Sequence, residues 1–75
     1  MNYTIILKRS VAKDSIKQTQ VIEQLRKING VLKLDTEMAN NCLLLAELSH
    51  TVDLEAIRQI EGVEDLEKNG VKHAL

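Results

Sequence analysis

The chain has 75 residues, of which 44% are hydrophobic and 28% are charged, and its net charge at pH 7 is −1. This length predicts one small domain with a thin core, and the composition excludes a disordered tail. Charges of both signs are interspersed and no apolar run approaches the roughly 18 residues of a membrane span, so neither nucleic acid nor a membrane is an expected partner.

The first part of the chain predicts a strand followed by a helix. Residues 3–8 are short and rich in β-branched side chains, which is typical of a strand. Residues 13–15 are expected to open a helix, in which Ser15 and Gln18 can form a capping box, and Asn29-Gly30 is expected to end it. Its expected apolar stripe consists of Ile16, Ile22, Leu25 and Ile28.

The second part of the chain predicts three further strands and one more helix. Residues 31–38 and 42–48 are expected to be strands joined by a turn at Asn40-Asn41, since Asn tolerates positive φ. A helix is expected over 53–61, with Asp53 or Thr51 as N-cap and Val52 stapled onto Ile57. Gly62 stops this helix, and residues 63–67 form the last strand.

The element order is therefore βαββαβ, in one stretch without a linker or repeat. Right-handed crossovers turn this order into an α+β, ferredoxin-like sandwich, in which a four-stranded antiparallel sheet has two helices on one face. The other face of the sheet is left uncovered, and alternation along the strands places Ile6, Leu43 and Leu45 on it. Such a patch predicts a docking surface, although scattered surface aliphatics are also common on small domains.

Residues that carry catalytic or metal chemistry are sparse and far apart. His50 and His73 lie at a helix entrance and near the C-terminus, and Cys42 is the single cysteine. We interpret Cys42 as a small buried hydrophobe. No metal-ligand spacing and no glycine-rich phosphate loop occur, so we expect neither a metal nor another cofactor, and no enzymatic activity.

Four segments in order resemble the propeptides of subtilisin-type serine proteases and the free-standing inhibitors of the same family. Residues 3–8 (YTIILK) are similar to the opening strand of these propeptides, and residues 29–31 (NGV) to the segment after their first helix. Residues 62–67 (GVEDLE) are similar to their last turn and strand. The most specific stretch is 67–75 (EKNGVKHAL), which aligns without a gap with bacterial propeptide ends that share the glutamate, the valine, the histidine and an apolar or aromatic last residue.

The resemblance implies an inhibitor domain over residues 1–71 and a protease-binding tail over residues 72–75. In the family the bare sheet face, here with Ile6, Leu43 and Leu45, lies across two helices of the protease, and the tail adds as a strand in the substrate cleft. By this resemblance Leu75 fills the primary specificity pocket, and Ala74, His73 and Lys72 occupy the next three subsites. The bound tail would then look like a trapped product.

The resemblance also gives roles to two residues that precede the tail. Glu67 would cap the N-terminal ends of the protease helices, where unpaired amides favour an anion. Asn69 stands where many propeptides have a second acid, and it can accept a hydrogen bond but brings no charge. Lys72 also departs from the family, which usually places a small or apolar side chain four residues from the end. These departures predict an atypical target protease or weaker binding.

The sequence thus predicts a non-catalytic inhibitor and folding assistant of a subtilisin-like protease, monomeric when free. As written the chain is expected to be cytoplasmic, because residues 1–3 run straight into a strand, and extracellular if it is excised from a secreted precursor. An alternative is a ferredoxin-like regulatory or oligomerisation module that pairs through its open sheet face. That alternative predicts a stable dimer whose behaviour does not depend on the tail.

Overall fold

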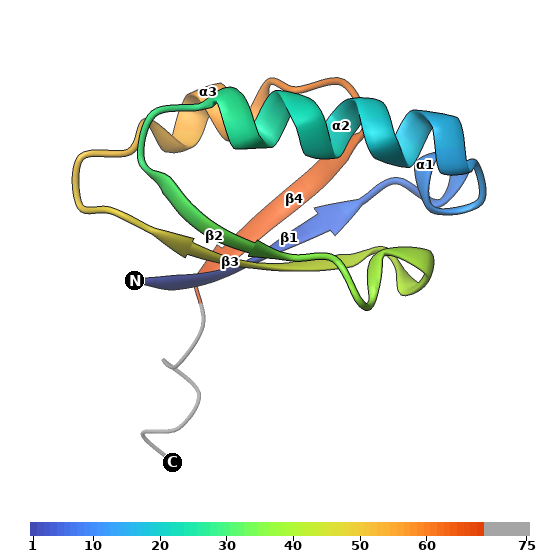
Figure 1. Ribbon diagram of the computed structural model, residues 1–75, viewed down its shortest axis with the longest axis horizontal. Helices are drawn as coiled ribbons and strands as arrows, with labels where there is room; N and C mark the ends of the chain where they lie inside the picture. The colour runs from blue at the N-terminus through green and yellow to red at the C-terminus, as the bar shows by residue number, and fades with distance from the viewer. Residues whose placement is uncertain (69–75) are drawn as a thin grey trace, which may run out of the picture.

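Four antiparallel strands form one layer of the protein and helices form the other, as the computed structural model shows for residues 1–68 (Figure 1). The strands lie in the order β2-β3-β1-β4. Their bounds are β1 Asn2–Leu7, β2 Val31–Asp35, β3 Leu43–Leu48 and β4 Val63–Lys68. The helices are α1 Arg9–Ala12, α2 Ser15–Lys27 and α3 Leu54–Arg58, with a 3₁₀ turn η1 over Ala39–Asn41. The predicted α+β, ferredoxin-like fold is confirmed.

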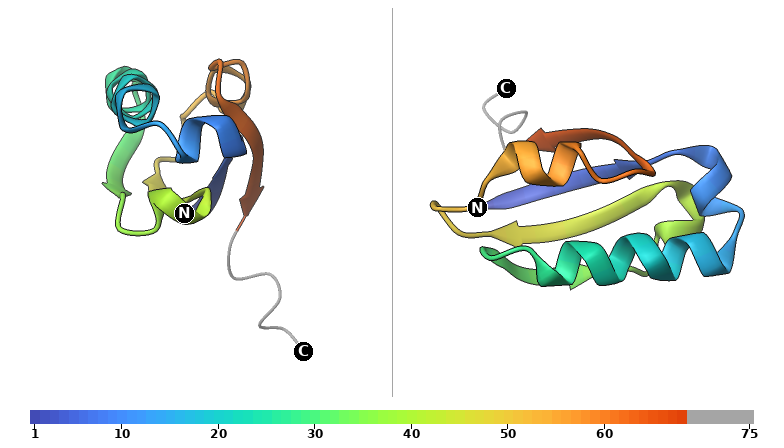
Figure 2. Two further views of the ribbon diagram at one scale, coloured as in Figure 1. Left: turned by 90° about the vertical axis from the view of Figure 1, so that its right-hand side faces the viewer. Right: turned by 90° about the horizontal axis from the view of Figure 1, so that it is seen from above.

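The core lies between the sheet and the helices, and the strand alternation that predicts it is confirmed. Tyr3, Ile5 and Leu7 of β1 are buried, while the residues between them are more exposed. The same alternation buries Leu44, Ala46 and Leu48 of β3. Helices α2 and α3 lie above opposite edges of the sheet, α2 on the side of β2 and α3 on the side of β4 (Figure 2). Among residues 1–68, no helix lies on the other face of the sheet.

Helix α2 starts where it was predicted, but its N-cap differs from the predicted one. Asp14, and not Ser15, is the N-cap, and its Oδ1 accepts hydrogen bonds from the N–H groups of Ile16 at 3.0 Å and Lys17 at 3.3 Å. The Gln18 side chain does not close a capping box, because its Nε2 donates to Ala12 O at 2.6 Å and to Asn40 Oδ1 at 2.8 Å. A carboxylate cap also complements the positive end of the helix dipole.

The two candidate caps of α2 can be separated by mutation. Asp14→Ala removes the acceptor of two otherwise unpaired N–H groups, so we expect it to lower the free energy of unfolding by about 1 kcal/mol. Ser15→Ala is the matched control, and it should change stability by less than about 0.5 kcal/mol. Urea unfolding followed by circular dichroism measures both variants. An equal loss in both would mean that the cap assignment is wrong.

Other departures from the predicted elements lie around β2 and η1. Strand β2 ends at Asp35 rather than at Met38, because the chain turns into η1 before it enters β3. The positive φ of this turn, 69°, is at Cys42 and not at an asparagine. Cys42 is therefore partly buried ahead of β3 instead of lying within it. Ile16, predicted in the apolar stripe of α2, is 70% exposed, and the unpredicted Val21 is buried with Leu25.

The remaining connections combine confirmed and unpredicted features. Asp53 caps α3 as predicted, with Oδ1 accepting from the N–H groups of Glu55 and Ala56, although the helix is shorter than expected. Gly30 and Gly62 both have φ of 104°, which accounts for glycine at these turns. The short helix α1 was not predicted, and it buries Val11 beside Gly62.

Within residues 1–68, no helix is long and apolar enough to cross a membrane.

Candidate functional site

The outer face of the sheet, which is the face without helices, has an apolar centre between carboxylates. Strand pairing places Ile6 of β1 opposite Leu43 of β3, and Thr4 opposite Leu45. Residues that are directly opposite each other in antiparallel strands share a face, so these four side chains form a contiguous group. We call Ile6, Leu43 and Leu45 the apolar centre.

The exposure of these residues matches their place on the outer face. Leu45 is 40% exposed, and Ile6 and Leu43 are half-buried, although none of the helices described in residues 1–68 covers this face. Neighbours across the strands account for the partial burial of Ile6 and Leu43, since the two are paired. The three residues named from strand alternation are therefore together on one surface. When another surface removes a leucine exposed to this degree from water, the free energy of the system falls.

Carboxylates border the apolar centre on both sides. On the β4 side, Asp65 lies opposite Ile6 and Glu67 lies opposite Thr4. On the β2 side, Asp35 lies opposite Leu45. A row across the sheet therefore reads Glu67, Thr4, Leu45, Asp35, with an acid at each end. This arrangement suits a partner whose surface has an apolar patch and positive partial or full charges around it.

Glu67 lies on the outer face near the end of β4, next to Thr4 on the neighbouring strand and one residue before Lys68. Its side chain belongs to an exposed residue, so the carboxylate is accessible to a partner. The structure places Glu67 on the same surface as the apolar centre. Asn69 and the four tail residues Lys72, His73, Ala74 and Leu75 lie outside the described residues.

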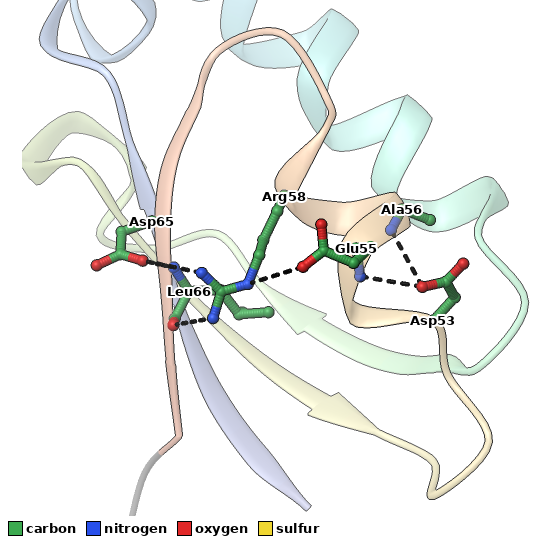
Figure 3. A network of polar contacts seen from close by, with 6 residues as sticks. All are labelled: Asp53, Glu55, Ala56, Arg58, Asp65 and Leu66. Carbon is green, nitrogen blue, oxygen red and sulfur yellow. Dashed lines mark hydrogen bonds and ion pairs between the residues drawn. The ribbon is translucent and has the colours of Figure 1, made fainter.

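A polar network on the free edge of β4 joins α3 to the sheet (Figure 3). Arg58 Nη1 lies 3.5 Å from Asp65 Oδ1, and Arg58 Nη2 donates to Leu66 O at 3.4 Å. Asp65 Oδ1 also accepts from Leu66 N–H at 2.7 Å, and Arg58 Nε lies 4.0 Å from Glu55 Oε1. Both backbone groups of Leu66 are thus bonded to side chains, which blocks this part of the edge to another strand.

A surface depression of about 300 Å³ lies in the helix layer, away from the apolar centre. It is bordered by polar and charged side chains of α1, α2 and the turn before β4, with two valines and Gly62. The lining residues are Lys8, Ser10, Val11, Lys17, Gln20, Val21, Gln24, Glu61 and Gly62. None of the residues predicted to bind a partner lines it.

The two described residues that the sequence singled out for catalytic or metal chemistry lie apart in the structure. His50 is exposed in the loop after β3, and Cys42 is partly buried at the opposite end of that strand. Within residues 1–68, no group of three or more His, Cys, Asp or Glu side chains is placed to hold a metal ion. His73 lies outside the described residues.

Some residues of the outer face were not singled out from the sequence. Thr4 and Asp65 belong to it because of their strand parity, which the sequence contains: Thr4 alternates with Ile5 as Ile6 does, and Asp65 shares parity with Glu67. The position of Asp35 depended on where β2 pairs with β3. That pairing has a bulge between Val31 and Lys33, which sequence alternation alone does not locate.

Comparisons with protein-family models, with curated proteins and with solved structures found no match to this chain.

Proposed function

We propose that this chain is a non-catalytic inhibitor of a subtilisin-like serine protease. In this proposal the apolar centre docks on the protease surface, and residues 72–75 occupy the substrate cleft as a product does. The observation that carries the proposal is the partly exposed group of Ile6, Leu43 and Leu45 on a sheet face that no helix of residues 1–68 covers. The resemblance of residues 67–75 to propeptide ends supports the role of the tail.

Two further features support this mode of binding. Glu67 is exposed on the outer face, where a carboxylate can meet the N-terminal ends of helices on a partner. The strand that carries it, β4, ends at Lys68, and the residues assigned to the cleft follow in the sequence from position 72, so docking and cleft binding use neighbouring parts of the sequence. An extended tail gains affinity from main-chain hydrogen bonds to the strands of a cleft and selectivity from its side-chain pockets.

The same contacts give the second proposed activity, which is assistance of protease folding. A protein that binds only the folded form of its partner shifts the folding equilibrium of that partner toward the folded form. The inhibitor would therefore raise the yield of active protease when it is present during refolding and later removed.

The decisive experiment is a subtilisin activity assay with the intact chain and with a chain that ends at residue 71. We expect the intact chain to inhibit and the shortened chain to inhibit at least about 100-fold less, because the shortened chain loses every contact within the cleft. Circular dichroism of both chains is the control, since the strands and helices that the structure describes end at Lys68 and should form without residues 72–75. Failure of the intact chain to inhibit would rule the proposal out.

The same pair of chains separates inhibition from the alternative function. A regulatory or oligomerisation module that pairs through its open sheet face would form a dimer that buries Leu45, with or without the tail. Equal inhibition by both chains would remove the role of the tail while leaving the docking face in place.

A further inference from the structure

The two free edges of the sheet differ in whether side chains bond their backbone groups, although both edges belong to short strands. At the β4 edge, Arg58 and Asp65 bond the backbone groups of Leu66. The backbone of β2 hydrogen-bonds to β3, and at its start Val31 N–H donates to Ile28 O. Within residues 1–68, no side chain hydrogen-bonds to the backbone of β2 at the free edge. An open edge of this kind is a template for another strand.

We propose that two copies of the chain pair antiparallel through β2, about a two-fold axis at Leu34. The pairing joins two four-stranded sheets into one sheet of eight strands, with all helices on the same side. It leaves Ile6, Leu43 and Leu45 uncovered, because these residues lie on the inner strands β1 and β3, so it can be tested separately from the proposed inhibition.

The register of this pairing follows from charge. Only registers that pair residues of equal parity keep the helices of both copies on one side. A register centred on Lys33 places two lysines opposite each other, and one centred on Asp35 does the same with two carboxylates. The register centred on Leu34 instead places Lys33 opposite Asp35 of the second copy, twice by symmetry, while the half-buried Leu34 meets its own equivalent.

The helix layer and the exposed apolar residues fit the same arrangement. Two strands occupy about 10 Å across a sheet, which is also the spacing of packed helices, so two helices over four strands continue as four over eight. Helix α2 lies on the β2 side and would meet α2 of the second copy (Figure 2). The two most exposed large apolar residues among residues 1–68, Ile16 at 70% and Leu32 at 60%, lie on α2 and β2.

A single edge strand makes a small interface, so we expect a dissociation constant on the order of 0.1 to 1 mM. The chain is then the expected monomer at the low concentrations of an inhibition assay. It becomes a dimer when it is concentrated. Added salt should weaken this association, because it screens the two charge pairs.

Sedimentation of the intact chain at rising concentration, with two charge variants, tests the proposal. Lys33→Asp places a carboxylate opposite Asp35 of the second copy, and Asp35→Lys places an ammonium opposite Lys33 of the second copy. Each variant alone should associate at least about tenfold more weakly than the unchanged chain. An equimolar mixture of the two variants should recover dimers, because every pair across the interface is again of opposite sign.

Two controls keep these results specific. Lys13→Asp changes the net charge as Lys33→Asp does, at an exposed position between α1 and α2, and should leave association unchanged. Thermal unfolding checks that Asp35→Lys still folds, since Asp35 Oδ1 accepts from Glu37 N–H at 2.9 Å. A chain that stays monomeric at 1 mM would overturn the proposal. So would a dimer that is lost in Leu45→Glu but kept in both charge variants, or a mixture that associates no better than its components.

Discussion

Leu45→Glu is expected to weaken the inhibition of a subtilisin by about 10- to 100-fold while leaving the fold unchanged. Leu45 is 40% exposed on the outer face, opposite Thr4 on one side and Asp35 on the other. Burial of a leucine side chain by a partner contributes about 1.5 to 3 kcal/mol, and each 1.4 kcal/mol corresponds to a factor of ten in affinity. The new carboxylate would also have to lose water beside Asp35.

The chain provides a matched control for this substitution. Leu32→Glu introduces the same charge at a leucine that is 60% exposed, in the bulged part of β2 and outside the apolar centre. Inhibition constants from progress curves should separate the two variants, with Leu32→Glu within a factor of three of the unchanged chain. If both variants inhibit as well as the unchanged chain, the outer face is not the docking surface. If both lose inhibition equally, general charge repulsion is the cause.

The features of the fold that were predicted correctly are those that depend on local patterns. Alternation in residues 3–8 predicts that the side chain of Ile6 lies on the opposite face of the sheet from its buried neighbours, and the structure shows this arrangement. Glycine at positions 30 and 62 predicts turns, and both have positive φ. These signals need no knowledge of distant residues, because side-chain direction in a strand and steric limits on φ are set within a few residues.

The features that were missed are decided by contacts between distant parts of the chain. Asp14 and Ser15 are both good N-caps, and Gln18 completes a capping box only if its side chain is free. In the structure Gln18 reaches Asn40, which is 22 residues away. Helix α1 has no side-chain cap, and Lys8 N–H just before it bonds to Gly62 O at 2.8 Å. No local pattern in residues 9–12 predicts such support.

The residues of the candidate site also divide into those predictable from local patterns and those decided by contacts between distant parts of the chain. The apolar centre was predictable because Ile6, Leu43 and Leu45 are apolar residues at exposed parities of strands whose order follows from the βαββαβ pattern. The carboxylates around it were less predictable, since the neighbours of Leu45 and Ile6 depend on register. Both edge pairings contain an irregularity, between Val31 and Lys33 and between Ile6 and Leu7, which shifts that register.

Gly30→Ala is expected to destabilise the domain more than any of the other substitutions proposed above. At φ of 104° an L-residue other than glycine is strained, at a cost of about 1 to 3 kcal/mol. A Cβ at this position would also lie 2.7 Å from Val52 Cβ, 2.9 Å from Val52 Cα and 3.0 Å from Ser49 Oγ. The Cα is backbone, and Gly30 O already accepts from Ser49 N–H at 2.8 Å, so the two segments cannot separate without losing that bond.

The overpacking adds about 1 to 3 kcal/mol to the strain, against a total stability of roughly 3 to 5 kcal/mol for a core of this size. We therefore expect the variant to be largely unfolded at 37 °C, with a melting temperature at least about 10 °C lower by calorimetry. Asn29→Ala is the neighbouring exposed control and should change stability by less than about 0.5 kcal/mol.

Gly62→Ala makes the comparison sharper, because it has the same φ but different neighbours. The two atoms closest to its Cβ would be side-chain methyl groups, Val11 Cγ2 and Val21 Cγ2, each at 2.9 Å. Methyl groups can move by rotation about χ1, whereas the backbone at Val52 cannot, so Gly62→Ala should cost less than Gly30→Ala. Equal losses at the two glycines would show that the conformational strain common to both dominates. A Gly30→Ala variant as stable as the unchanged chain would mean that the close approach of Gly30 to Val52 is wrong.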